Sequence, residues 1–222
     1  MSRSIVKRLL LKDLYFARHL IVGSIVLGFG CLGLSISGPV SFYVGTVSLL
    51  CVLIVLNIFL VVSGVVNERK ERTQLFILSL PISTSQYMRW KLLFSFLAFF
   101  VPWLILTIAA VVVIDVSVIP NGFIPFAVIV LMYLLFYNVL LLSVTLANDS
   151  LAWNTAIIIF GNISINFVIA YLMAMPAVNH SLWGREAVWN TQEIAILAVE
   201  VGLSLVTLGL GFLFASRKRD FI

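Results

Sequence analysis

Residues 67–91 read NERKERTQLFILSLPISTSQYMRWK and form the longest polar interruption in an otherwise nearly continuous series of apolar segments. A charged opening followed by an apolar run predicts a short amphipathic helix over residues 71–78. This helix should end before Pro81, because a proline disfavours helical geometry at the residue that precedes it. Ser83 and Gln86 then have the spacing of a capping box, which predicts that the next helix starts here. The stretch therefore separates two long apolar helices and carries a short helix of its own.

The composition places the chain in a membrane. Hydrophobic residues make up 62% of the 222 residues, charged residues make up 10%, and the mean hydropathy is +1.17, whereas soluble domains are about half apolar and a quarter charged. A helical span needs roughly 20 apolar residues. We therefore expect an all-α polytopic membrane protein with a single transmembrane domain and no room for a soluble one. The six predicted spans are residues 20–36, 41–66, 92–114, 123–146, 152–173 and 194–215.

The segment before the first span, residues 2–19, has an amphipathic pattern. Leu10 and Leu14 fall on one helical face, whereas Arg8 and Lys12 project from the other. This pattern is typical of a helix that lies in the membrane interface. The alternative is that the segment is simply the charged flank of the first span.

The basic residues predict the orientation of the chain. Five of the 14 Lys and Arg precede the first span, five lie in the 67–91 loop, three follow the last span, and only Arg185 falls on the other side. Because an excess of Lys and Arg marks cytoplasmic loops, we expect both termini and the loop to be cytoplasmic. The net charge of +5 follows from this orientation, since the basic residues flank apolar spans. We therefore expect the lipid bilayer, and no nucleic acid, as a partner.

The loop resembles a segment of a known family. A charged E-R-K-x-x-T opening, an apolar run and S-L-P-[IV]-S before the next span are similar to the loop between spans two and three of ABC (ATP-binding cassette) type-two exporter permeases. The family usually has glycine where this chain has Arg72 or Thr73. The matching residues are Glu68, Arg69, Lys70, Thr73, Ser79, Leu80, Pro81, Ile82 and Ser83.

The resemblance implies a permease subunit of the bacterial cytoplasmic membrane. Such a subunit would form half of a dimeric pathway with a second, identical or similar permease, and it would work with two copies of a separate ATPase subunit that binds ATP and magnesium. The short helix in the loop would couple the two subunits. The expected ATPase-coupling residues are Glu71, Arg72, Leu75, Phe76 and Leu78.

Nothing in the sequence indicates that this chain is itself an enzyme. It lacks the G-x-x-x-x-G-K-[ST] loop that holds nucleotide phosphates, so ATP hydrolysis would belong to another chain. The two histidines, His19 and His180, fall on opposite sides of the predicted membrane. This excludes a catalytic or metal-binding histidine pair within one subunit.

Polar residues at membrane depth are the candidates for a substrate pathway, because an ionisable or strongly polar group inside a span is costly. For the asparagines, the alternative is a structural hydrogen bond between helices, and the glutamate could extend toward the membrane surface. The candidates are Asn57, Asn138, Asn162, Asn166 and Glu200.

The sequence therefore favours the permease subunit of an ATP-driven exporter, with no cofactor of its own. Two other classes stay open. An ion-coupled carrier would need no ATPase, and a membrane scaffold or sensor partner without transport would show the same six spans. No internal repeat favours the carrier, which commonly shows one.

Overall fold

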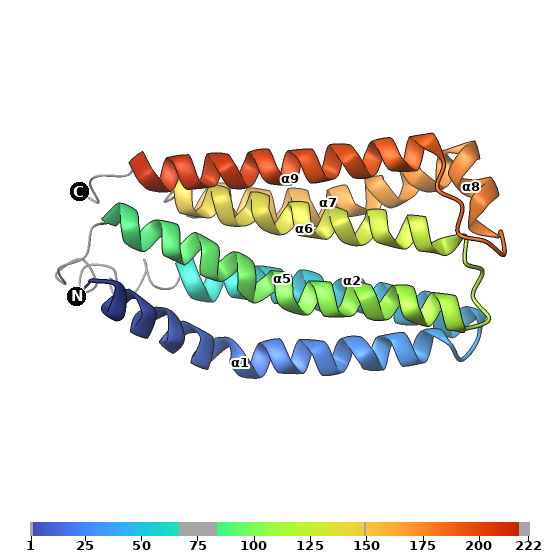
Figure 1. The fold of residues 1–222 in the computed structure, drawn as a ribbon, viewed down its shortest axis with the longest axis horizontal. Helices are drawn as coiled ribbons and strands as arrows, with labels where there is room; N and C mark the ends of the chain where they lie inside the picture. The colour runs from blue at the N-terminus through green and yellow to red at the C-terminus, as the bar shows by residue number, and fades with distance from the viewer. Residues whose placement is uncertain (1, 67–83, 149, 218–222) are drawn as a thin grey trace.

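The computed structural model describes residues 2–66, 84–148 and 150–217, and within them it contains helices and no β-strand. Figure 1 shows a bundle of long helices that run side by side, with one short helix at one end. The elements are α1 (Ser2–Ser35), α2 (Pro39–Val61) continued by the π-helical turn η1 (Val62–Val66), α5 (Thr84–Val116), α6 (Phe123–Ala147), α7 (Leu151–Ala174), the short α8 (Pro176–Leu182) and α9 (Thr191–Arg217).

Six of these helices are long and apolar enough to cross a membrane, which confirms the predicted all-α polytopic membrane fold. The apolar stretches are 19 to 32 residues long, and at 1.5 Å per residue the shortest of them comes close to the ~30 Å hydrocarbon thickness of a bilayer. Large hydrophobic side chains on the outside of the bundle are correspondingly frequent on α1, α2, α5, α7 and α9. In a bilayer these side chains face lipid or another protein.

The two ends of the bundle differ in charge. The described basic residues Lys12, Arg18, Arg89 and Lys91 lie at the end where α1 and α5 begin, which we call the basic end, and Arg185 lies at the opposite end. Exposed tryptophans occur near both ends, as is typical of membrane interfaces. Trp90 and Trp153 are at the basic end, and Trp183 and Trp189 are at the opposite end.

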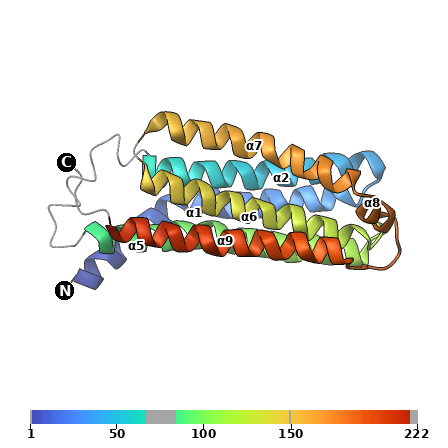
Figure 2. The same ribbon diagram turned by 90° about the horizontal axis from the view of Figure 1, so that it is seen from above.

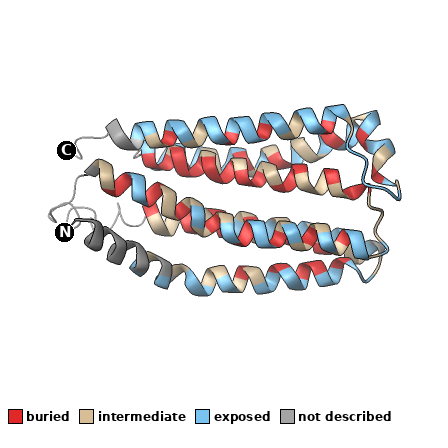
Figure 3. Cartoon of the chain, viewed as in Figure 1, coloured by how far each residue is buried: buried red, intermediate tan, exposed pale blue. Residues whose placement is uncertain are grey.

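Helix α6 lies at the centre of the bundle (Figure 2) and is the most deeply buried span. The red, buried positions in Figure 3 are accordingly densest along it. Polar contacts join α6 to four neighbouring helices, and α7 has two of them, one of which is between Tyr133 Oη and Ser164 Oγ at 2.5 Å. Trp103 Nε1 of α5 donates to the Leu131 carbonyl at 2.7 Å, Asn138 Nδ2 donates to Asn57 Oδ1 of α2 at 2.7 Å, Tyr137 Oη donates to the Ile158 carbonyl of α7 at 3.2 Å, and Ser143 Oγ donates to the Thr207 carbonyl of α9 at 3.3 Å.

The predicted N-terminal interfacial segment and the first span form one uninterrupted helix, α1. This helix bends, and its first part is inclined to the rest of the bundle (Figure 1). Whether residues 2–19 lie in the interface stays a prediction. Helix α5 also bends near its middle, where Pro102 removes one backbone hydrogen bond from the helix.

Glycines allow α1 to lie unusually close to its neighbours, although not every glycine of α1 takes part. A β-carbon on Gly45 of α2 would lie 2.5 Å from the Cys31 carbonyl oxygen and 2.9 Å from the Ser35 amide nitrogen of α1. Gly28 of α1 faces the Leu106 side chain of α5, whereas a β-carbon on Gly33 would have no neighbouring atom within 4 Å. The α1–α2 contact therefore depends on Gly45.

We predict that Gly45→Val lowers the free energy of unfolding by about 1–3 kcal/mol, the usual cost of overpacking a close contact. Gly33→Val makes the same chemical change in a helix where the new side chain meets open space, and it serves as the control. Thermal unfolding of both variants in detergent measures the difference. Equal stability of the two variants would contradict the close α1–α2 contact.

Candidate functional site

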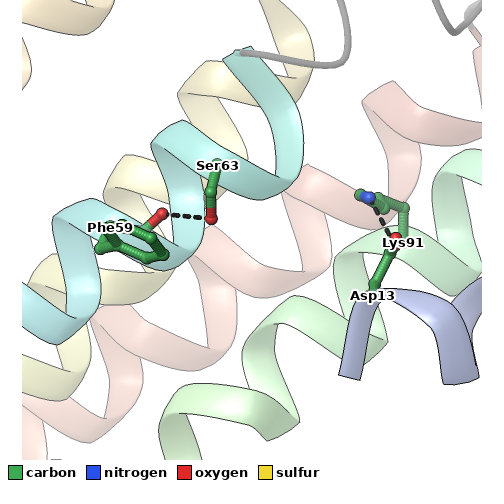
Figure 4. A network of polar contacts seen from close by, with 4 residues as sticks. All are labelled: Asp13, Phe59, Ser63 and Lys91. Atoms are coloured by element: carbon green, nitrogen blue, oxygen red, sulfur yellow. Dashed lines mark hydrogen bonds and ion pairs between the residues drawn. The ribbon is translucent and has the colours of Figure 1, made fainter. Parts of the chain in front are cut away.

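The helix that leads into the 67–83 segment changes its winding just before that segment begins. Residues Val62–Val66 form the π-helical turn η1 at the end of α2. Ser63 Oγ donates a hydrogen bond to the Phe59 carbonyl at 2.6 Å (Figure 4), which occupies a carbonyl within the last turn of the regular helix. Single π-helical turns are rare and frequently lie at functional sites. The sequence did not predict this turn.

The helix that leaves the segment is anchored by an ion pair. Lys91 Nζ of α5 lies 2.7 Å from Asp13 Oδ2 of α1 (Figure 4), and the Lys91 side chain is only 3% exposed. A buried ammonium group needs such a partner, because removing one member of a buried pair leaves an uncompensated charge. The pair therefore fixes the base of α5 to the N-terminal part of α1. Sequence reasoning missed it, since the two residues are 78 positions apart.

The five predicted coupling residues belong to the segment between η1 and α5, which the structure does not describe. Glu71, Arg72, Leu75, Phe76 and Leu78 lie outside the residues that the structure describes. What the structure describes is the two ends of the loop, the turn η1 and the start of α5 at Thr84. The helix start at Thr84 follows directly on Ser83, the predicted capping residue.

Two of the five predicted pathway residues are brought together. Asn138 Nδ2 donates to Asn57 Oδ1 at 2.7 Å, and both side chains are 1% exposed. This one bond uses the nitrogen of Asn138 and the oxygen of Asn57. The other two amide atoms, Asn57 Nδ2 and Asn138 Oδ1, have no hydrogen-bond partner among the described residues. The pair joins α2 to α6 nine residues from the end of α6, or roughly 14 Å from the basic end.

The two asparagines of α7 have a different setting. Asn162 Nδ2 donates to the Ile158 carbonyl at 2.8 Å, and Asn166 Nδ2 donates to the Asn162 carbonyl at 3.0 Å. Both amides thus bond within their own helix, and Asn166 is exposed on the outside of the bundle. Asn162 is half-buried, and neither residue joins the Asn57–Asn138 pair.

Glu200 is buried within the bundle. It is 7% exposed, and its Oε2 atom has no hydrogen-bond partner among the described residues. It lies nine residues into α9, or about 14 Å from the opposite end, so it is in the other half of the membrane from the Asn57–Asn138 pair. Helix α6 also separates them, since Asn138 faces α2 whereas Ser143 faces α9.

Near the opposite end, a polar cluster that was not predicted closes the bundle. Asn190 and Glu193 form a reciprocal capping box, with the Glu193 amide donating to Asn190 Oδ1 at 2.9 Å and the Asn190 amide donating to Glu193 Oε2 at 3.0 Å. Ser181 Oγ of α8 also contacts Glu193 Oε1 at 3.4 Å. The N-x-x-E spacing before an apolar run was a signal for this cap. The cluster starts α9 and holds α8 against it.

Neither metal chemistry nor a relative identifies the site. Across residues 2–66, 84–148 and 150–217, no group of three His, Cys, Asp or Glu side chains could hold a metal ion. No protein-family model, curated protein or solved structure matches the chain. The function is therefore inferred from the chain's own residues.

We predict that Asn57→Ala and Asn138→Ala each lower the free energy of unfolding by about 1 kcal/mol, the usual scale of a hydrogen bond between helices in a membrane. The double variant should cost clearly less than the sum of the two, because each single change removes the same bond. Asn166→Ala, whose amide bonds only its own helix, is the control. Unfolding in mixed micelles measures all four, and strictly additive losses would show that the bond contributes nothing.

Proposed function

We propose that this chain is the permease subunit of an ABC type-two exporter and that it is coupled to a separate ATPase through its 67–83 segment. The observation that supports the proposal most directly is that α5 is one unbroken helix. This 33-residue helix begins at the end of the segment that resembles the family's coupling loop and reaches the opposite end of the bundle. At its base, the Lys91–Asp13 pair links it to α1. A displacement of the segment would therefore move two spans together.

The orientation in the proposal follows from the charge asymmetry. The basic end holds Lys12, Arg18, Arg89 and Lys91, and positive residues mark the cytoplasmic side. Helices η1 and α5 meet the 67–83 segment at this same end. In this orientation the segment and both termini face the cytoplasm of a bacterial cell, where a soluble ATPase subunit with bound ATP and magnesium can reach them.

A second permease subunit completes the proposed pathway. Helices α7 and α9 are only slightly buried within the single chain, so each leaves a broad face for another protein. Exposed Asn166 lies on one of these faces. A pathway between two copies, or between this chain and a similar one, would be lined by such residues. Peptides, antibiotics and other amphipathic molecules are the proposed cargo class.

We predict that Phe76→Ala reduces the amount of ATPase subunit that co-purifies with this chain from gently solubilised membranes. The physical reason is that Leu75, Phe76 and Leu78 give the predicted 71–78 helix an apolar surface, and helix-in-groove contacts concentrate binding energy in one or two large anchors. Glu68→Ala, nearer the end of η1, is the matched control and should leave recovery unchanged. The ATPase is recognised by mass spectrometry as a chain with a phosphate-binding loop.

The same experiment separates the alternatives. A carrier or a scaffold would purify without any such ATPase, and that result would overturn the proposal. If an ATPase is recovered but both Phe76→Ala and Leu75→Ala leave recovery, ATP hydrolysis and transport at parental levels, then the segment is not the coupling element.

We predict that Glu200→Gln leaves folding intact but changes transport or transport-stimulated ATP hydrolysis in reconstituted vesicles. Glutamine keeps the size of the side chain and removes a carboxyl group whose Oε2 atom is buried without a partner in the described structure. Gln is also the less costly group inside a membrane, so the melting temperature should not fall. Glu193→Gln, which alters a carboxyl group that already caps α9, is the control for transport. Unchanged transport in Glu200→Gln would remove Glu200 from the pathway.

A further inference from the structure

A cavity of about 360 Å³ lies in the half of the bundle nearer the opposite end. Its walls come from α1, α2, α5, α6, α7 and the α8 region, and the α6 residues Ala127, Val130 and Leu131 form part of its lining. A second cavity of about 250 Å³ adjoins it, because the two share lining residues such as Phe42 and Phe123. The second cavity reaches the turns at Gly38 and Pro120, at the end of the bundle. We call these two adjoining cavities the hollow.

The lining of the larger cavity is mainly apolar and suits an apolar ligand. Its described lining residues include no charged one. Each serine, threonine and asparagine side chain in its wall already donates a hydrogen to a backbone carbonyl. Ser35 Oγ donates to Cys31 at 3.0 Å, Thr46 Oγ1 donates to Phe42 at 2.7 Å, and Asn179 Nδ2 donates to Met173 at 3.1 Å. Tyr43 and Trp183 also line the cavity, but both are exposed. Deeper in the cavity a polar ligand would give up hydrogen bonds to water and gain few in return, which is unfavourable, whereas a hydrocarbon chain gives up none.

The cavity also has access to the membrane. Tyr43 and Val47 of α2 and Met173 of α7 line it and are 60%, 59% and 40% exposed, respectively. The hollow therefore opens sideways between α2 and α7. Tyr43 and Met173 are close to the ends of their helices, so the opening lies toward the membrane surface at the opposite end. Where no second subunit covers this opening, the molecules beside it in a bilayer are phospholipids.

Aromatic rings surround the end of the hollow that is nearest this surface. Phe123 is at their centre, with ring centroids 5.3 Å from Phe42 and 5.4 Å from Trp183. Trp183 is exposed, and tryptophans commonly lie at the level of lipid headgroups. A phospholipid with its headgroup at the level of Trp183 would therefore have its acyl chain inside the hollow.

We propose that the cavity binds one acyl chain of a membrane phospholipid from the leaflet at the opposite end. The lipid inserts its chain between α2 and α7 and reaches the buried wall formed by α6. Its headgroup stays at the membrane surface near Trp183. The volume falls in the range of natural ligand cavities, which is about 300–1,000 Å³. The bound chain fills space that would otherwise leave the packing between α2, α6 and α7 incomplete.

The test uses the full chain in phospholipid vesicles that contain a phospholipid with a photoactivatable diazirine in one acyl chain. Val130 and Leu131 are 4% and 3% exposed, so bulk lipid cannot reach them, but both line the cavity. After illumination, mass spectrometry should find the label on these residues. Leu141 and Leu142 of the same helix are as deeply buried and do not line the cavity, and they should stay unlabelled.

A pair of matched variants adds a second measurement. Ala127→Phe places a ring in the cavity and should reduce labelling of Val130 and Leu131 several-fold, whereas Ala198→Phe, on the exposed face of α9, should not. Label confined to exposed positions of the unmodified protein would overturn the proposal, even if Ala127→Phe failed to fold. So would efficient cross-linking between two copies through cysteines placed at Val47, because a second copy would then cover the opening.

Discussion

The whole bundle depends on how α6 satisfies polar groups inside hydrocarbon. Lipid tails are as apolar as leucine, so helices in a membrane are held together by close packing and hydrogen bonds rather than by exclusion from water. Helix α6 makes one such bond with each of α2, α5 and α9 and two with α7. Helix α1 is held differently, by the glycine contact at Gly45 of α2 and by the Lys91–Asp13 pair with α5. The order of the helices around α6 follows from these contacts.

The two halves of the bundle are consequently built in different ways. Toward the basic end, the Asn57–Asn138 bond and the Lys91–Asp13 pair join α2 to α6 and α1 to α5. Toward the opposite end, α2 and α7 are separated by an apolar cavity, and the bundle is closed by the Glu193 cap and by aromatic rings around Phe123. Polar bonds between helices occur in both halves, since Trp103 donates to the Leu131 carbonyl in the half nearer the opposite end. The buried ion pair belongs to the half that adjoins the 67–83 segment, whereas the large apolar cavity belongs to the other.

The sequence predicted the number and approximate limits of the spans because each needs a long apolar run, which is visible without knowledge of packing. It could not predict which helix is central. Apolar periodicity separates a core face from a solvent face only when the solvent is water, and the exposed Phe167 and the buried Leu172 of α7 are both apolar. For the same reason the sequence did not distinguish Gly28, which faces α5, from Gly33, which meets open space. The capping box at Asn190 and Glu193 was predictable from local spacing and was missed.

The predicted pathway residues looked alike in the sequence, because each was a polar group at membrane depth, and the structure gives them different explanations. Asn57 and Asn138 bond to each other, so a structural role between α2 and α6 accounts for their presence. Asn162 and Asn166 bond within their own helix and need no partner helix to remain in a membrane. Glu200 is buried with an oxygen that no described residue satisfies. Asn57 and Asn138 also keep one unsatisfied atom each among the described residues, but Glu200 is the one ionisable residue of the five, and an ionisable group inside a span is the most costly. A partner such as water, an ion or cargo would reduce this cost, which makes Glu200 the strongest of the five candidates for a functional role.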